Sequence, residues 1–401
     1  MLETWRWYGP DLDPITLGSI AQTGVTGIVS ALHEIPYGAV WTRDEIAARR
    51  QQIEAGGFSW AVVESLPVHE RIKLGDGDLS GLFASYRQSM ANLAAEGVQV
   101  ICYNFMPLLD WTRTELAHPL PHGGTCLRFE THRMAAFEIH MLGREAARDA
   151  YLRETRVRAA DWADRATDAD RAELLSAIMA GMPGAFDRYD IAGLRRQLAR
   201  YDGLTAADIR ANLARFLAEI VPAAADLGLR LCIHPDDPPR DILGLPRIVS
   251  SAEDIAFILQ TQDSPANGLT LCTGSLGAGA ENDLPAIARR FADRIHFAHL
   301  RNVRKDPDGS FEEAAHLDGD TDMVAVIAEL LAEEARRRDM GRTDAQIPFR
   351  PDHGHVLGPD HDLPAVVGYP YVGRLRGLAE LRGVIRALSH TAYQSFERSA
   401  R

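Results

Sequence analysis

The stretch LRLCIHPDDPP, residues 229–239, indicates most directly how this chain folds. Residues 229–233 form a short apolar run, and the polar group HPDD follows at once. Similar runs at 268–272, 295–299 and 347–350 lead into CTGS, LR and PDHGH, and amphipathic stretches separate the runs. Short apolar runs that alternate with helical spacing are typical of repeated strand–helix units. The second half of the chain therefore predicts four buried strands.

The first half repeats this pattern. Four further strands are expected at 5–8, 26–30, 58–64 and 99–103, with helices from residue 14 and at 42–55, 80–96, 253–262, 282–291 and 322–338. Thr42, with Glu45 three residues later, is typical of a helix start. A doubly wound sheet is an alternative, but eight strand–helix units favour an α/β fold of the (β/α)8 TIM-barrel class.

One long segment interrupts the repeat. About 125 residues separate the fourth and fifth expected strands, and residues 144–180 and 205–227 have helical spacing. We expect one domain over residues 1–401, with a mostly helical insertion at 128–227. An insertion of this length is usually a functional lid or a subdomain, whereas its charges alone are explained by a solvated helical face.

Composition narrows the possible partners and location. Of 401 residues 46% are hydrophobic and 25% charged, and 43 Lys and Arg stand against 56 Asp and Glu, a net charge of −13. This balance excludes a disordered chain and argues against nucleic acid or an anionic membrane, although a small anionic substrate remains possible. The four scattered cysteines predict reduced thiols. Neither a signal peptide nor an apolar run of about 18 residues, the length that spans a bilayer, is recognisable. We therefore expect a cytoplasmic protein.

Four consecutive expected strands each deliver a side chain that can bind a metal. These are His234, Cys272, His299 and Asp352. In a barrel the carboxyl ends of the strands meet at one face, and two imidazoles, a thiolate and a carboxylate make a divalent-metal site. Each alone is more often structural. Strand alternation puts His296 on the opposite face from His299, so His296 is expected to be structural.

Other chemistry-bearing residues have simpler readings. Cys102 and Cys232 lie among apolar residues and are expected to be buried and inert. The glycine-rich segment 274–279 favours a flexible turn, and anion binding at a helix start stays open. Asp236 and Asp237 are either metal-linked or turn residues before two prolines.

Motifs from end to end resemble those of the mannonate dehydratase family. The matching stretches are TWRWYGP (4–10), VVESLPVHE (62–70), CYNFMPLLDWTRT (102–114), HPDDPPRDILGLPRIVS (234–250), CTGSLG (272–277), HLR (299–301), EAAHLDGDTDM (313–323), RPDHGH (350–355) and GRLRGLAELRG (373–383). The resemblance implies a xylose-isomerase-like barrel that dehydrates D-mannonate to 2-keto-3-deoxy-D-gluconate in hexuronate breakdown. It also implies Mn²⁺ or Fe²⁺ as cofactor.

The resemblance assigns residues as well. The family's metal ligands fall on His234, Cys272, His299 and Asp352, and its catalytic histidine and tyrosine fall on His353 and Tyr369. A thiolate ligand alone would suggest Zn²⁺ or Fe²⁺. We expect Mn²⁺ or Fe²⁺, the metals that the resemblance implies. As an alternative, His353 orients a metal ligand.

That chemistry suggests where the substrate binds. Arg301 and Arg350 share faces with the expected ligands and are candidates for the substrate carboxylate, or else form buried ion pairs. Asn104, His33 and Glu64 end earlier strands and are candidates for the sugar hydroxyls. The expected partners are a small sugar acid and further copies of the chain, a dimer or higher.

Two other readings compete. A metal-dependent sugar isomerase on the same barrel would use a site rich in carboxylate and histidine, and Cys272 speaks against it. A barrel that only binds a sugar acid would be expected to lose a ligand or His353, and all are present.

Overall fold

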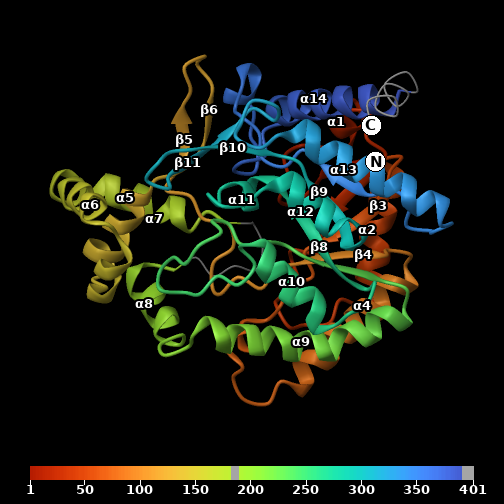
Figure 1. Ribbon diagram of the computed structural model, residues 1–401, viewed down its shortest axis with the longest axis horizontal. Helices are drawn as coiled ribbons and strands as arrows, with labels where there is room; N and C mark the ends of the chain where they lie inside the picture. Colours follow the sequence, from red (N-terminus) through yellow and green to blue (C-terminus); the bar gives the residue numbers. More distant parts are fainter. Residues whose placement is uncertain (182–188, 391–401) are drawn as a thin grey trace.

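Eight parallel strands close into a barrel in the computed structural model, which describes residues 1–181 and 189–390 (Figure 1). The strands are β1 (Leu2–Arg6), β2 (Gly27–Ser30), β3 (Ser59–Glu64), β4 (Val100–Tyr103), β7 (Arg230–Ile233), β8 (Asn267–Cys272), β9 (Ile295–His299) and β12 (Pro348–Arg350). Their order around the barrel follows the chain, and β1 pairs with β12 to close it. The predicted TIM-barrel class is confirmed.

The prediction of a first strand at 5–8 is wrong. The structure has β1 at Leu2–Arg6, paired with β12 from Leu2 and with β2 up to Arg6. The backbone N–H of Trp7 still donates to Val29 at 2.9 Å, but the chain turns out of the barrel at Gly9, whose φ is +93°. The aromatic run at 5–8 continues past the end of β1 because apolar side chains indicate burial, and a buried residue need not pair with a neighbouring strand.

Helices surround the barrel. They are α1 (Leu17–Ala21), α2 (Arg43–Ala55), α4 (Ser80–Ala95), α9 (Ala206–Asp226), α10 (Ala252–Thr261), α12 (Leu284–Arg290), α13 (Met323–Asp339) and α14 (Tyr371–Ser389), with short α3 (Glu70–Leu74) and α11 (Thr273–Gly277) at strand ends. Thr42 caps α2 in a capping box with Glu45, as its sequence predicts. Among the described residues, none of these helices is long and apolar enough to cross a membrane.

The segment between β4 and β7 is built from several short elements. In order these are β5 (Glu115–Pro119), β6 (Thr125–Phe129), α5 (Thr131–Ala136), a π-helix (Phe137–Met141), a 3-10 helix (Glu145–Ala150), α6 (Arg153–Arg165), α7 (Asp168–Ile178) and α8 (Ile191–Ala199). The helices α5, α6 and α7 extend to one side of the barrel (Figure 1). Helix α9 contacts α3, α4 and β7 and so belongs to the barrel's outer ring. The expected insertion at 128–227 also includes residues 182–188, which lie outside the described residues.

A second sheet, which the sequence reading missed, covers one part of the barrel mouth. The strands β10 (Asn302–Lys305) and β11 (Phe311–Ala314) follow β9, and the antiparallel order is β10-β11-β6-β5. Phe129 of β6 stacks on Phe311 of β11 with ring centroids 5.5 Å apart. This sheet therefore joins the loop after β9 to the segment after β4.

Apolar side chains fill the barrel interior below its carboxyl-terminal mouth. A buried cluster there consists of Val29, Val62, Cys102, Cys232 and Phe297. All four cysteines of the chain are free and buried, and burial raises the pKa of the Cys102 thiol well above its usual range. This cluster closes the interior of the barrel beneath the mouth.

Candidate metal centre and active site

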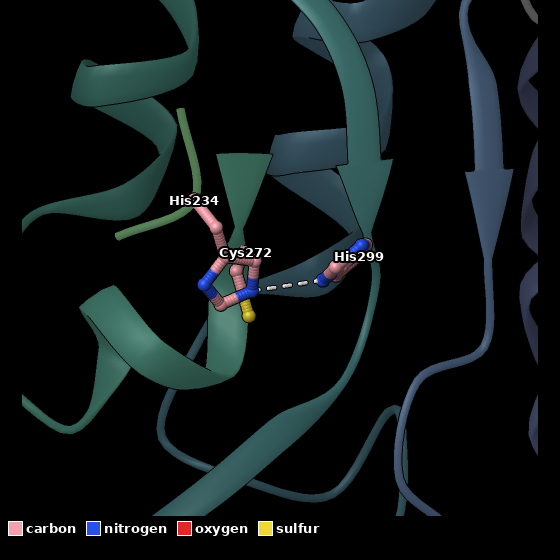
Figure 2. A group of neighbouring side chains, drawn as sticks. All are labelled: His234, Cys272 and His299. Atoms are coloured by element: carbon pink, nitrogen blue, oxygen red, sulfur yellow. Dashed lines mark hydrogen bonds between the residues drawn. The ribbon is translucent and has the colours of Figure 1, made fainter. Parts of the chain in front are cut away.

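The ends of three neighbouring strands bring His234, Cys272 and His299 together (Figure 2). Cys272 and His299 are the last residues of β8 and β9, and His234 directly follows β7. One nitrogen or sulfur atom from each lies within 4.8 Å of the others, and Nε2 of His234 is 3.1 Å from Nδ1 of His299. Parallel pairing puts these positions at one height, so the sequence spacing alone assembles the group.

The two imidazoles direct lone pairs at each other. Nδ1 of His234 lies 2.7 Å from the backbone carbonyl of Pro235, which can only accept, so this nitrogen carries the hydrogen. Nε2 of His299 faces the carboxylate of Glu64 at 3.4 Å, which favours a hydrogen there. In neutral rings the facing nitrogens are then both acceptors, 3.1 Å apart. Only a proton or a metal cation between them removes this conflict.

Cys272 adds negative charge to the same point. Burial raises the pKa of its thiol, but Arg301 and the hydrogen bonds with His234 and His299 outweigh this and hold that pKa well below its usual range. In turn, burial lowers the pKa of His234, yet the neighbouring Cys272 raises it to about 10. Without a metal, the thiolate thus holds a proton on the neighbouring ring, and a divalent cation bound by the thiolate and the two neutral imidazoles would replace that proton.

Asp352 lies beside this group. Its Oδ2 is 3.8 Å from Sγ of Cys272 and 3.8 Å from Nδ1 of His299. Burial raises the pKa of Asp352, but Arg350, His353, His299 and Arg301 together hold it well below its usual range. The donor set of two nitrogens, one sulfur and one oxygen fits a divalent transition metal with some affinity for sulfur.

A small pocket with a volume of about 20 Å³ lies next to the cluster. His353 and Tyr369 are part of its wall. The His353 ring packs edge-on between Trp111 and Tyr369, with centroids 5.4 and 5.1 Å away. The Tyr369 hydroxyl donates to Asp352 at 3.4 Å, and burial together with Tyr8 and Asp352 raises its pKa well above the usual range. The pocket thus holds a phenol that keeps its proton and an imidazole held edge-on between two rings.

The predicted carboxylate-binding arginines are buried and already paired. Arg350 donates to both oxygens of Glu64, at 3.0 and 2.7 Å, and also to Asp352. Arg301 contacts Asp237, Glu313 and Asp352. Both arginines line the small pocket, so contact with a substrate stays a prediction, and the ion pairs named as its alternative are present.

Asn104 and His33 line a larger cavity of about 270 Å³ beside the pocket. Asn104 donates to Asp110 at 2.9 Å and, with Ser65 and Asp110, borders both spaces. His33 lies 3.3 Å from Arg6, and burial, Arg6 and Arg49 hold its pKa well below the usual range. Tyr189, Gln197 and Arg200, from helix α8 and the residues beside it, complete the far wall.

Two motifs left open in the sequence now have structural roles. Asp237 pairs with Arg113 and Arg301, and Asp236 accepts from the backbone N–H of Val249 at 2.7 Å, so among the described residues neither acid lies in the metal cluster. Residues 273–277 form α11, and Cys272 caps it by accepting from the backbone N–H of Ser275. A side chain at Gly274 would overlap Arg301. The glycine is needed for packing, which decides against a freely flexible turn.

The sequence reading missed the second sheet and with it Glu313. Residues 302–314, NVRKDPDGSFEEA, contain a turn of the Asp-Gly type between two short strands, which is a hairpin signal. Glu313 of this hairpin reaches the site, where it lies 2.9 Å from Nδ1 of His353 and pairs with Arg113 at 2.7 Å.

Comparison with known proteins gives consistent matches over nearly the whole chain. The family profile described as D-mannonate dehydratase (UxuA) matches residues 1–395. A mannonate dehydratase from Chromohalobacter salexigens is 53% identical over 98% of this chain and 100% of its own length, and one from Rhizobium meliloti is 52% identical over 98% of each. The crystal structure of mannonate dehydratase from Streptococcus suis serotype2 matches with a TM-score of 0.75 and 33% identity, covering 96% of this chain and 93% of its own.

Proposed function

This chain belongs to the D-mannonate dehydratase family, and we infer that it is a hydro-lyase that removes water from D-mannonate. The product is 2-keto-3-deoxy-D-gluconate. One observation carries this conclusion at the level of the site: the cluster of His234, Cys272 and His299 borders, through His234, a small pocket that is also lined by His353 and Tyr369, two side chains that can carry a proton.

The family implies a divalent metal, and we propose that His234, Cys272, His299 and Asp352 hold Mn²⁺ or Fe²⁺. The facing lone pairs, the thiolate and the adjacent carboxylate support this ligand set. A bound divalent cation supplies Lewis-acid stabilisation of negative charge on the carboxylate and 2-hydroxyl oxygens of the substrate. The sulfur donor favours Fe²⁺ over Mg²⁺, and Mn²⁺ is proposed from the family resemblance.

The two protons of the reaction are assigned to His353 and Tyr369. Nδ1 of His353 faces the Glu313 carboxylate, so its Nε2 is free to accept the proton from C2 of the substrate. Tyr369 retains its proton and gives it to the departing 3-hydroxyl, which leaves as water. The C2–H and C3–O bonds break, a C2–C3 double bond forms, and the resulting enol converts to the keto acid. Return of the proton from His353 to Tyr369 through solvent completes the cycle.

The rest of the substrate extends into the larger cavity. A pocket of about 20 Å³ is too small for a six-carbon acid, whereas the adjoining cavity of about 270 Å³ has room for the distal carbons. We propose that Asn104 and His33 contact hydroxyl groups there. The charges of Arg301 and Arg350 beside the small pocket favour the anionic end of the substrate, and Glu64 orients His299.

Product analysis tests this function directly. Protein loaded with Mn²⁺ is incubated with D-mannonate, and the products are identified by NMR and mass spectrometry. We expect a 2-keto-3-deoxy acid and its loss on treatment with a chelator. An isomerised sugar acid in its place, or no product from metal-loaded protein, would refute the proposal.

The biological setting follows from the reaction. We propose that the enzyme acts in hexuronate breakdown in the cytoplasm, which its reduced, buried cysteines support. We also propose a homo-oligomer, a dimer or higher, and light scattering of the purified protein tests it.

A further inference from the structure

Glu313 is the carboxylate that contacts the predicted catalytic histidine. It comes from β11 of the second sheet, outside the barrel, and its side chain is buried. Nδ1 of His353 lies 2.9 Å from Oε1 of Glu313, and the backbone carbonyl of Glu313 lies 2.9 Å from Nε2 of His355. One residue of the sheet thus contacts two histidines of the barrel's last strand–helix loop.

Two arginines keep this carboxylate ionised and fixed. Arg113 and Arg301 both donate to Oε1 of Glu313, at 2.7 and 2.6 Å. Asp237 holds the two guanidinium groups in turn, because it accepts from Arg113 at 2.7 and 3.0 Å and also from Arg301. Two guanidinium cations that donate to one oxygen of Glu313 stabilise its ionised form over the protonated form.

This arrangement determines which nitrogen of His353 faces the substrate. An ionised carboxylate only accepts, so Nδ1 of His353 carries a hydrogen toward Glu313 and, in the neutral ring, Nε2 carries the lone pair. The ring cannot turn away easily, because Trp111 and Tyr369 pack edge-on against it.

We propose that Glu313 is a positioning residue that fixes the tautomer and orientation of His353, and that the second sheet delivers it to the barrel mouth. The hairpin β10–β11 carries Glu313, and β6 pairs with β11 to hold it in place. This inference rests on the proposed dehydration, in which Nε2 of His353 accepts the proton from C2.

Glu313→Gln in the Mn²⁺-loaded full-length enzyme tests the proposal. Glutamine keeps the shape but loses the charge, so we expect kcat to fall about 100-fold while KM for D-mannonate and metal content stay within threefold of the wild type. The matched control is Glu312→Gln in the same strand, since Glu312 pairs with Arg128 at 2.9 Å and not with His353. We expect the control to keep kcat within twofold.

Several results would overturn the proposal. These are an unchanged kcat in Glu313→Gln, a change confined to KM, and loss of bound metal, because each contradicts a role in orienting His353. If wild-type protein forms no keto acid, the proposed function fails, and that result is distinct from any of these.

A second measurement does not depend on whether Glu313→Gln folds. In wild-type protein loaded with diamagnetic Zn²⁺, nitrogen-15 NMR of the histidine rings reports which nitrogen carries the hydrogen, and His353→Asn identifies the signal. We expect the hydrogen of His353 on Nδ1 and an unprotonated Nε2. A hydrogen on Nε2 would overturn the proposal.

Discussion

Acid should destabilise this fold through His296, which lies in β9 but faces away from the metal cluster. The ring is buried, and Nε2 lies 2.9 Å from the backbone carbonyl of Pro265. Burial, with Arg337 and Arg230, lowers the pKa of His296 from 6.5 to about 3 in the folded protein. The folded state therefore keeps this histidine neutral at a pH where the unfolded chain binds a proton.

The sign and size of the effect follow from linkage. The folded pKa is depressed, so this contribution to stability is complete above pH 6.5 and is lost as the pH falls toward 3. At pH 5 the loss is about 2 kcal/mol, since the unfolded pKa lies about 1.5 units above that pH and each unit corresponds to about 1.4 kcal/mol. Below pH 3 the loss reaches about 5 kcal/mol.

His296→Gln isolates this contribution. Glutamine can still donate to Pro265 but does not titrate. We therefore expect the difference in free energy of unfolding between the wild type and the less stable variant to shrink by about 2 kcal/mol from pH 7 to pH 5. Urea unfolding of both proteins in chelator, followed by circular dichroism, measures the deficit. His361→Gln, at an exposed position, should show no such change. An equal deficit at both pH values for His296→Gln would refute the reasoning.

Three further predictions concern the metal, the catalytic group and the packing around it. Chelation should abolish activity, and Mn²⁺ or Fe²⁺ should restore it better than Mg²⁺. Equal rescue by Mg²⁺ would count against the thiolate ligand. Cys272→Ser should weaken metal binding by about 100-fold, as measured by equilibrium dialysis. His353→Asn should lower kcat by about 100-fold or more with metal still bound, as steady-state kinetics and elemental analysis will show, and retained turnover would remove His353 from the mechanism. Gly373→Ala should lower the free energy of unfolding by about 3 kcal/mol in thermal unfolding, because the new Cβ would lie 1.8 Å from the carbonyl oxygen of His355. As a control in the same helix, the Cβ of Gly383→Ala meets nothing within 4 Å, so this substitution should be neutral or stabilising. Equal effects of the two substitutions would contradict this packing.

Much of the barrel was readable because buried strands are continuous apolar runs. All six residues of β8 are buried, and β9 covers Ile295–His299, the range predicted from its apolar run. The same reading gave His234, Cys272 and His299, because neighbouring parallel strands bring equivalent positions to one height. The aromatic run at Trp7 misled only because burial continues beyond the last paired residue of β1.

The second sheet and its carboxylate were not readable in this way. The strand β11 reads FEEA, and two adjacent acidic residues look like a solvated loop when considered locally. What buries Glu313 is Arg113, 200 residues earlier in the chain, together with Arg301. Similarly, the paired state of Arg350 depends on Glu64, 286 residues away. Local pattern carries no information about such distant charge partners.

The second sheet also affects how the protein behaves at high concentration. A closed barrel has no free strand edges, but the order β10-β11-β6-β5 adds two edge strands, which in general invite pairing with another chain. The edge β10 carries Arg304 and Lys305, and the edge β5 ends in Pro119, which has no N–H to donate. These residues oppose strand addition between molecules, so the sheet that brings Glu313 to the site is protected against aggregation at both of its edges.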